Sequence, residues 1–179
     1  LWCTDGSETG TRLVKDVNPG GPSSLQFGRI TAVDGGVYFL ANDGTHGIEL
    51  WKSDGTESGT YLVKDVNPGA GHGVINTELL EVGGVLYFGA YDGTHDQALW
   101  RSDGAASGTR QVQDVASNQA QSPGLAGIYG HSLLFVGSDS SNVHYLWRSD
   151  GTSAGTTLLE SLGNGPFIGV FVWKSLAII

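Results

Sequence analysis

The sequence predicts an all-β protein made of four-stranded antiparallel meanders, arranged as the blades of a β-propeller. A motif of the form LWxSDGTxxGTxLVKDV occurs four times, with substitutions, in 179 residues. Short segments rich in β-branched and aromatic residues lie between Gly-containing turns, which is typical of strands. No segment has the apolar period of 3.6 residues that marks an amphipathic helix, and each of the 29 glycines would cost about 1 kcal/mol inside one.

The repeat defines the domain organisation. Its copies begin at Leu1, Leu50, Leu99 and Leu146, and the tryptophans that follow are 49, 49 and 47 residues apart. Periods of this length are typical of propellers, solenoids and repeat arrays. We therefore interpret residues 1–179 as one repeat domain of about four units, the last of which is incomplete.

One period predicts four strands joined by short turns. The strands are expected at residues 29–33, 37–41, 48–52 and 60–66. Asp-Gly pairs separate them, because Gly supplies positive φ and Asp accepts local backbone hydrogen bonds. The run Val37-Tyr38-Phe39-Leu40 is apolar at consecutive positions, which predicts a sheet that is covered on both faces.

The positions of the chain ends within the repeat predict ring closure. The long link after each Lys-Asp-Val strand makes that strand the outermost of its blade. Residue 1 falls at a third strand and residue 179 near a first or second strand. We expect the strand at 11–17 to be the outer strand of a sheet whose inner strands lie in 167–179, which would close a four-blade ring. Half of an eight-blade ring and a fragment of a longer array are the alternatives.

The repeated residues have mainly structural interpretations. We expect Trp51 and Trp100 to be buried between neighbouring blades, with sugar stacking as the functional alternative. The aspartates that precede glycine suit turns better than calcium, because the pattern D-x-[DN]-x-[DN]-G is absent. They are Asp5, Asp54, Asp103 and Asp150.

Charge and apolar patterning exclude several partners. The formal charge is −9, from 18 acidic and 9 basic residues without a basic cluster, which argues against nucleic acid and anionic membrane surfaces. No apolar run reaches 18 residues, so membrane insertion is not expected. The single cysteine, Cys3, occupies a variable position that holds Lys or Arg in the other copies, and it predicts no internal disulfide.

Two segments carry a resemblance to a known family. Glu49–Val66 reads ELWKSDGTESGTYLVKDV and Leu146–Thr156 reads LWRSDGTSAGT, and both resemble the bacterial ELWxxDGT repeats. The resemblance implies propeller-like β structure in secreted or surface proteins, and hence an extracellular, cell-surface or periplasmic location. Cys3-Thr4 and Glu160-Ser161 depart from the family's Lys-Ser and Lys-Asp pairs.

No catalytic motif is present, so an enzyme is not expected. The sequence has no GxSxG elbow, HExxH pair or phosphate-binding loop, and it predicts neither cofactor nor metal. The favoured function is a non-enzymatic recognition module, lectin-like in one form, that binds a protein or carbohydrate surface partner. The alternative is a structural or assembly module within a larger complex. The sequence alone does not choose between them.

Candidate ligand-binding residues come from the loops between the second and third strands. His46 and His95 occupy equivalent positions there, and Asn142 takes the corresponding place in the next repeat. These loops are expected on one face of the molecule and the SDGTxxGT turns on the other, because one strand separates them. His72, His131 and His144 share no repeat register, so the sequence does not support a histidine metal cluster.

Overall fold

The computed structural model describes residues 1–22, 24–74, 78–94, 97–113, 121–139, 141–164, 171–173 and 176–178. Within these ranges the chain forms strands, turns and loops. No helix occurs there, and so none that is long and apolar enough to cross a membrane. The all-β prediction is confirmed.

Three complete sheets occupy the middle of the chain, each an antiparallel meander in which consecutive strands pair. Sheet II contains β3 (Leu25–Val33), β4 (Gly36–Asn42), β5 (Ile48–Ser53) and β6 (Tyr61–Lys64). Sheet III contains β7 (Leu80–Val82), β8 (Val85–Ala90), β9 (Ala98–Ser102) and β10 (Arg110–Gln113). Sheet IV contains β11 (Gln121–Tyr129), β12 (Ser132–Ser138), β13 (His144–Ser149) and β14 (Thr157–Gly163). The four strands expected for each period are therefore present, and the Lys-Asp-Val strand lies at one edge of its sheet.

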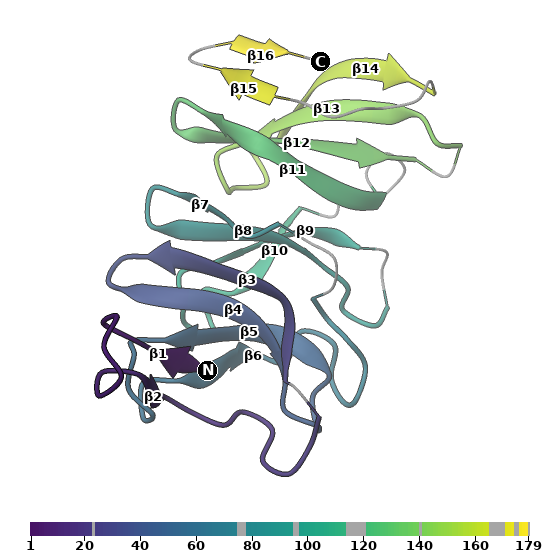
Figure 1. Cartoon of the computed structure of the whole chain (residues 1–179). Helices are drawn as coiled ribbons and strands as arrows, with labels where there is room; N and C mark the ends of the chain where they lie inside the picture. Colours follow the sequence, from purple (N-terminus) through teal and green to yellow (C-terminus); the bar gives the residue numbers. More distant parts are fainter. Residues whose placement is uncertain are drawn as a thin grey trace.

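Two-stranded sheets lie at the two ends of the stack (Figure 1). Sheet I pairs β1 (Trp2–Cys3) with β2 (Arg12–Leu13), which correspond to the third and fourth strands of a period. Sheet V pairs β15 (Phe171–Trp173) with β16 (Leu176–Ile178), which correspond to the first and second. Each end thus holds one half of a four-stranded sheet.

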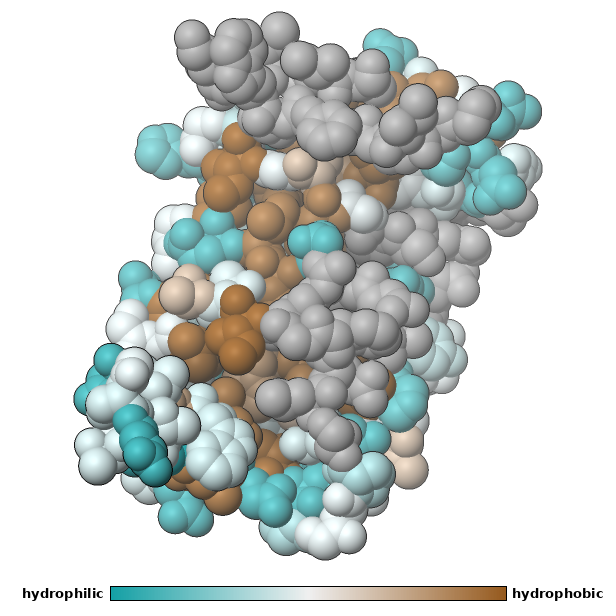
Figure 2. All heavy atoms as spheres, viewed as in Figure 1, coloured by the Kyte–Doolittle hydropathy of each residue, from teal (hydrophilic) through white to brown (hydrophobic). Residues whose placement is uncertain are grey.

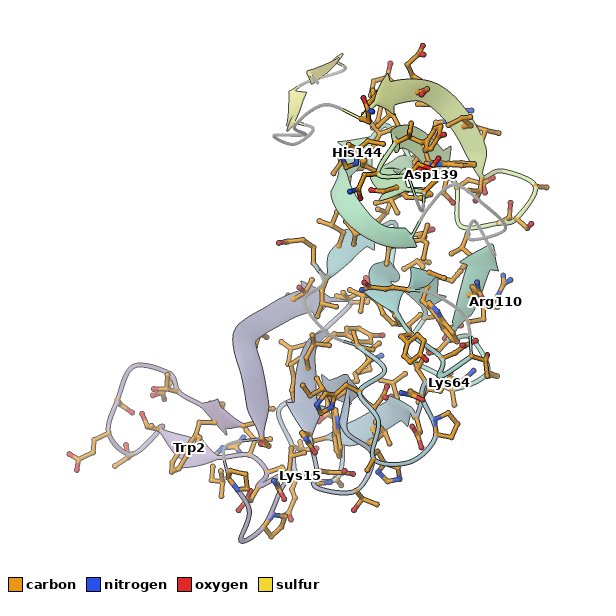
Figure 3. The ribbon with its side chains drawn as sticks, turned by 90° about the vertical axis from the view of Figure 1, so that its right-hand side faces the viewer. Trp2, Lys15, Lys64, Arg110, Asp139 and His144 are labelled. Carbon is orange, nitrogen blue, oxygen red and sulfur yellow. The ribbon has the colours of Figure 1, made fainter. Side chains whose placement is uncertain are left out.

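The predicted closure is wrong. Residues of the first copy and of the last segment lie in separate sheets, at opposite ends of an open arc (Figures 1 and 3). The reason is that β15 packs beside β11, so the last hairpin extends the stack beyond sheet IV and does not return to sheet I. Two strands do occur near the C-terminus, but the first begins at Phe171, and residues 165–170 lie outside the described residues.

Strand register gives every complete sheet two apolar faces. In sheet II, Phe39 pairs with Trp51 and Leu40 pairs with Leu50. Phe39 and Trp51 pack with Leu1 and Val17 of the first copy. Alternate residues of the same strands turn the other way, because side chains alternate across a strand. Leu40 and Leu50 accordingly pack with residues of sheet III.

Each buried tryptophan packs against the sheet that precedes it. Trp100 joins the core between sheets II and III, and Trp147 joins the core between sheets III and IV. The exposed fractions are 7% for Trp51, 7% for Trp100 and 9% for Trp147, whereas Trp2 is 65% exposed. The expected burial of Trp51 and Trp100 is confirmed. Trp2 differs because no described sheet precedes it.

A further apolar surface follows the first strands of the sheets. Ile30, Ile128 and Tyr129 are 50%, 41% and 40% exposed. Hydrophobic atoms gather along this side of the stack in Figure 2, where β3, β7 and β11 face the viewer in Figure 1. The stack is therefore polar at its turns and apolar along its first strands.

Candidate functional site

The SDGT turns are built from internal hydrogen bonds. Asp54 Oδ1 accepts from the backbone N–H of Thr56 at 2.8 Å and from its hydroxyl at 2.7 Å. These bonds, the hydroxyl first, lower the pKa of Asp54. Ser53 Oγ and Thr60 Oγ1 share a hydrogen bond of 2.7 Å across the turn. The Asp54 carboxylate also fills the space that a Cβ on Gly59 would need, which explains the Gly of the GT pair.

The same geometry recurs in the other copies. The Ser–Thr bond measures 2.7 Å between Ser102 and Thr109, and 2.7 Å between Ser149 and Thr156. The first copy repeats it between Thr4 and Thr11 at 2.7 Å. These aspartates and hydroxyls therefore act in turn formation, as predicted.

Each complete sheet's turn is also held by side chains of the sheet before it. Lys15 Nζ donates to Thr60 O at 2.7 Å, and Lys64 Nζ donates to Thr109 O at 2.8 Å (Figure 3 labels both lysines). Three further donors reach the turn glycine carbonyls: Arg12 to Gly55 at 3.1 Å, Tyr61 to Gly104 at 3.1 Å and Arg101 to Gly151 at 3.2 Å. The SDGT face is thus used to join neighbouring sheets.

The predicted binding loop between β4 and β5 contains a hydrogen bond between a histidine and a carboxylate. His46 Nδ1 lies 2.7 Å from Asp43 Oδ2, with the His46 side chain 38% exposed. The hydrogen bond to Asp43 raises the pKa of His46. Burial opposes the change at Asp43, but the backbone N–H and the ring of His46 lower its pKa. The loop therefore presents a partly exposed imidazole, hydrogen-bonded to a carboxylate, at its surface.

The preceding link packs onto these loops. Asn18 lies against Gly44, where an added Cβ would come within 2.9 Å of Asn18 Oδ1. Asn67 lies against Gly93 in the same way, at 2.5 Å. Both glycines have positive φ, 83° and 88°. The asparagine of each Asn-Pro-Gly link thus positions a DGTH loop of the next sheet.

A buried glutamate lies beneath the His46 loop. Glu49 is 0% exposed, and its carboxylate accepts from Val66 N at 3.2 Å and Asn67 N at 3.4 Å. Burial raises its pKa to about 8, and the charge of Asp65 adds to the rise against the opposite effect of the N–H donors. The side chain anchors the start of the long link.

Two of the three predicted ligand residues lie in loops of different sheets. His46 lies between β4 and β5, and Asn142 lies between β12 and β13, two sheets further along. Asn142 is exposed, with φ of 59°, and its N–H donates to Asp139 O at 3.0 Å within a turn. His95 lies outside the described residues. The proposed ring of loops therefore remains a prediction.

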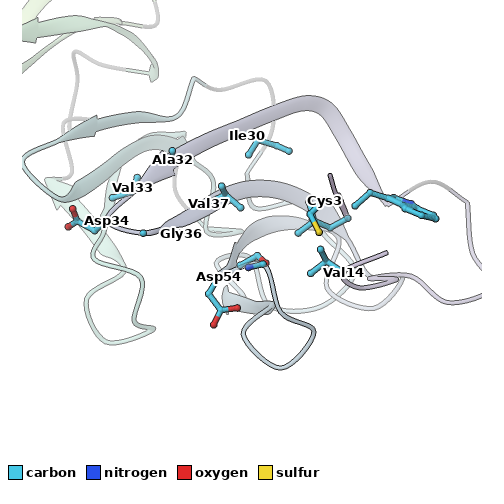
Figure 4. A pocket seen from close by; sticks show the side chains of 14 residues that line it. Cys3, Val14, Ile30, Ala32, Val33, Asp34, Gly36, Val37 and Asp54 are labelled. Carbon is cyan, nitrogen blue, oxygen red and sulfur yellow. The ribbon is translucent and has the colours of Figure 1, made fainter. Parts of the chain in front are cut away.

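A groove of about 550 Å³ lies between sheet I and the first strands of sheet II. Figure 4 shows Ile30, Ala32 and Val37 of β3 and β4 on one side, with Cys3 and Val14 across from them. The groove lies where Cys3 and Val14 of the first copy face the β3–β4 hairpin without filling the space between them. The part that a first and second strand would cover stays open.

A second hollow lies at the opposite end of the stack. A hollow of about 270 Å³ lies on the outer face of sheet IV and is lined by Tyr129, Leu134, Leu146, Arg148 and Leu159. Here β15 packs beside β11, the first strand, whereas β14 is exposed along most of its length. Leu159 is 47% exposed. Its equivalents Val63 and Val112 in complete inter-sheet cores are each 3% exposed.

Sequence reasoning missed both end surfaces and the Glu49 anchor. The end surfaces depend on where sheets I and V lie. The predicted ring joins these two sheets, so it leaves no end surface exposed. A signal for Glu49 was present: the position becomes Ala98 and Tyr145 in the next copies, so a carboxyl there is not part of the common turn.

Comparison with known proteins identifies no relative of this chain. Neither a protein-family model nor a curated protein matches the chain. The resemblance to ELWxxDGT repeats is therefore carried by the repeated residues alone.

Proposed function

We propose that the chain is a non-enzymatic assembly module, a propeller-like arc of β-sheets that joins a larger extracellular or surface complex through its two end surfaces. The carrying observation is the contrast among equivalent tryptophans: Trp2 is 65% exposed, whereas Trp51, Trp100 and Trp147 are 7 to 9% exposed. A large aromatic side chain left in water is typical of an interaction surface.

The polar turns support the same function. The SDGT turns of the complete sheets are held by donors from neighbouring sheets, so their groups serve cohesion within the stack. The two end surfaces lack such a neighbour in the described part of the chain, and both are apolar. An end surface is therefore the better candidate for contact with another protein.

Footprinting tests this proposal without knowledge of the partner. Hydroxyl-radical oxidation followed by mass spectrometry compares the isolated, dilute chain with the complex purified from its source. We expect Trp2 and Leu159 to be protected in the complex, with Trp51 as the buried reference in both samples. Equal oxidation of Trp2 in the two samples would reject an assembly role for this surface.

A second candidate is recognition through the DGTH loops, and the exposed Asp43–His46 pair favours it. An imidazole at a loop surface can donate a hydrogen bond to an anionic group of a protein or carbohydrate, and the bond is stronger when the ring is protonated. His46→Ala combined with His95→Ala should then reduce binding on a glycan or protein array while the melting temperature stays unchanged. Trp2→Ala is the contrasting variant, since it changes only the end surface.

A further inference from the structure

We propose that the link between sheets II and III is a pH-sensitive switch that sets the position of the DGTH loop of sheet III. The link is residues 65–74, which follow β6, and the described part of the loop is residues 91–94, which follow β8. The link is closed while Glu49 holds a proton, and it opens when Glu49 loses that proton. This inference goes beyond the two functions above and depends on neither of them.

Glu49 joins the two ends of the link. Its side chain is 0% exposed, and its carboxylate accepts hydrogen bonds near the start of the link, from Val66 N at 3.2 Å and Asn67 N at 3.4 Å. Near the end of the link, the backbone N–H of Gly73 also donates to this carboxylate. The carboxylate fills the space that a Cβ on Gly73 would need. One buried side chain therefore holds the link in a closed loop.

Two backbone hydrogen bonds fix the end of the closed link to its neighbours. Val74 N donates to Ile48 O at 3.0 Å, which joins the link to the first residue of β5. Tyr91 N donates to Gly73 O at 2.8 Å, which joins the first residue of the loop to the link. A displacement of the link therefore breaks one bond to sheet II and one bond to sheet III.

Asn67 adds a side-chain contact between the link and the loop. Its side chain lies against Gly93, where it leaves no room for a Cβ. Its Nδ2 also donates to His72 O at 3.3 Å, within the link. Because the backbone N–H of the same residue donates to Glu49, the position of the loop is coupled to the buried carboxyl through one residue.

Burial and charge both favour the protonated form of Glu49. Burial, and to a smaller extent the charge of Asp65, raise the pKa of Glu49 from its ordinary value of 4.5 to about 8. Asp65 Oδ1 is itself buried and has no hydrogen-bond partner in the described part of the chain, so it offers nothing that offsets a second negative charge. Opening the link exposes the Glu49 carboxyl to water and restores its ordinary pKa. The closed link therefore binds the proton more tightly, and the equilibrium shifts toward the open link as pH rises.

The other titratable groups packed around the link have partners of their own. His46 is close enough to interact with the buried carboxyl, but its Nδ1 lies 2.7 Å from Asp43 Oδ2. His72 Nδ1 accepts from the N–H of the first residue of β5 at 3.0 Å. Lys64 directs its ammonium group to sheet III, where Nζ donates to Thr109 O at 2.8 Å. None of these described groups forms an ion pair with the buried carboxyl, so its own proton controls its charge.

Amide hydrogen exchange, measured by NMR on the whole chain between about pH 6 and pH 7.5, tests the switch. The reporters are the amides of Val74 and Tyr91, because each donates to a backbone carbonyl and not to Glu49. Their protection factors, which correct for the intrinsic effect of pH on exchange, should fall by about tenfold per pH unit in the wild type. The amides of Gly108 and Thr156, in SDGT turns, are the references, and their protection should not change with pH.

Glu49→Gln should abolish the fall at both reporters, because a neutral amide of similar shape has no proton to lose. Glu57→Gln is the matched control, since Glu57 is exposed in the SDGT turn of the same sheet, and here the fall should remain. The wild-type pH profile keeps the test decisive if Glu49→Gln does not fold.

Three results would overturn the proposal. The first is protection at Val74 that does not vary with pH in the wild type, or a fall that persists in Glu49→Gln. The second is a fall at Val74 without one at Tyr91, because the loop would then not follow the link. The third is exchange of both reporters only as slowly as the amides of β4, since the link would then open only when the whole chain unfolds.

Discussion

The clearest consequence of the sheet stacking is a large difference between two chemically identical substitutions. Trp100→Ala removes a side chain that is 7% exposed and packs in the core between sheets II and III. Trp2→Ala removes the same side chain from the same repeat position, but there it is 65% exposed. Sheet II precedes the sheet of Trp100, whereas no described sheet precedes that of Trp2.

The magnitude follows from buried area. A tryptophan buries about 150 to 250 Å² in a core, and at roughly 25 cal/mol per Å² this corresponds to about 4 to 6 kcal/mol. Trp100→Ala should therefore cost about 3 to 5 kcal/mol, the usual range for large-to-small core substitutions. The cation–π contact of Lys64, whose Nζ lies 5.5 Å from the Trp100 ring centroid, is lost as well. Trp2→Ala should cost about 1 kcal/mol or less, in proportion to its smaller buried area.

Urea unfolding followed by far-ultraviolet circular dichroism measures both costs, because that signal comes mainly from the backbone. The protein is kept dilute, so that self-association does not stabilise the wild type. Equal free-energy losses for the two variants, or a loss under about 1 kcal/mol for Trp100→Ala, would refute the inter-sheet role of these tryptophans.

Three further predictions concern single groups. Because the folded-state pKa of Glu49 is about 8 and the model-compound value is 4.5, wild-type stability should fall as pH rises through that window. Glu49→Gln should remove this fall, a difference of about 3 to 4 kcal/mol between pH 5 and pH 8 in urea titrations; parallel curves would contradict the buried carboxyl. Gly104→Ala should lower the melting temperature more than Gly6→Ala. Both have positive φ, but only Gly104 lies against Tyr38 and Lys52, so equal shifts would argue against that packing. In His46→Ala, loss of the surface pair with Asp43 should change the free energy of unfolding by about 1 kcal/mol or less, and a larger loss would assign the loop a structural role.

The repeat allowed much of the local structure to be predicted from sequence. The motif spacing, the Asp-Gly turns and the apolar runs gave four strands per period, and β5 at Ile48–Ser53 differs from the expected strand by one residue. The burial of Trp51 and Trp100 followed from their recurrence. These features depend on contacts within one period or between adjacent periods, which the repeat itself encodes.

Ring closure could not be predicted in the same way. Whether the ends meet depends on the angle between successive sheets, which large side chains such as Trp100 and Trp147 set in three dimensions. A strand count is compatible with closed and open arrangements alike. The change of residue at the Glu49 position between copies marks this side chain in the sequence, but its partners could not be predicted, because the donors on Val66 and Asn67 are backbone groups.

The open arc itself is tested most directly by the distance between the two half-sheets within one chain. Spin labels on Cys3 and on Cys introduced by Ile178→Cys, with labelled chains diluted in unlabelled chains, restrict double electron–electron resonance to intrachain pairs. The open arc predicts only long distances and no population of labels on adjacent strands. A dominant short distance, consistent with paired strands about 5 Å apart, would show a closed ring and contradict the account.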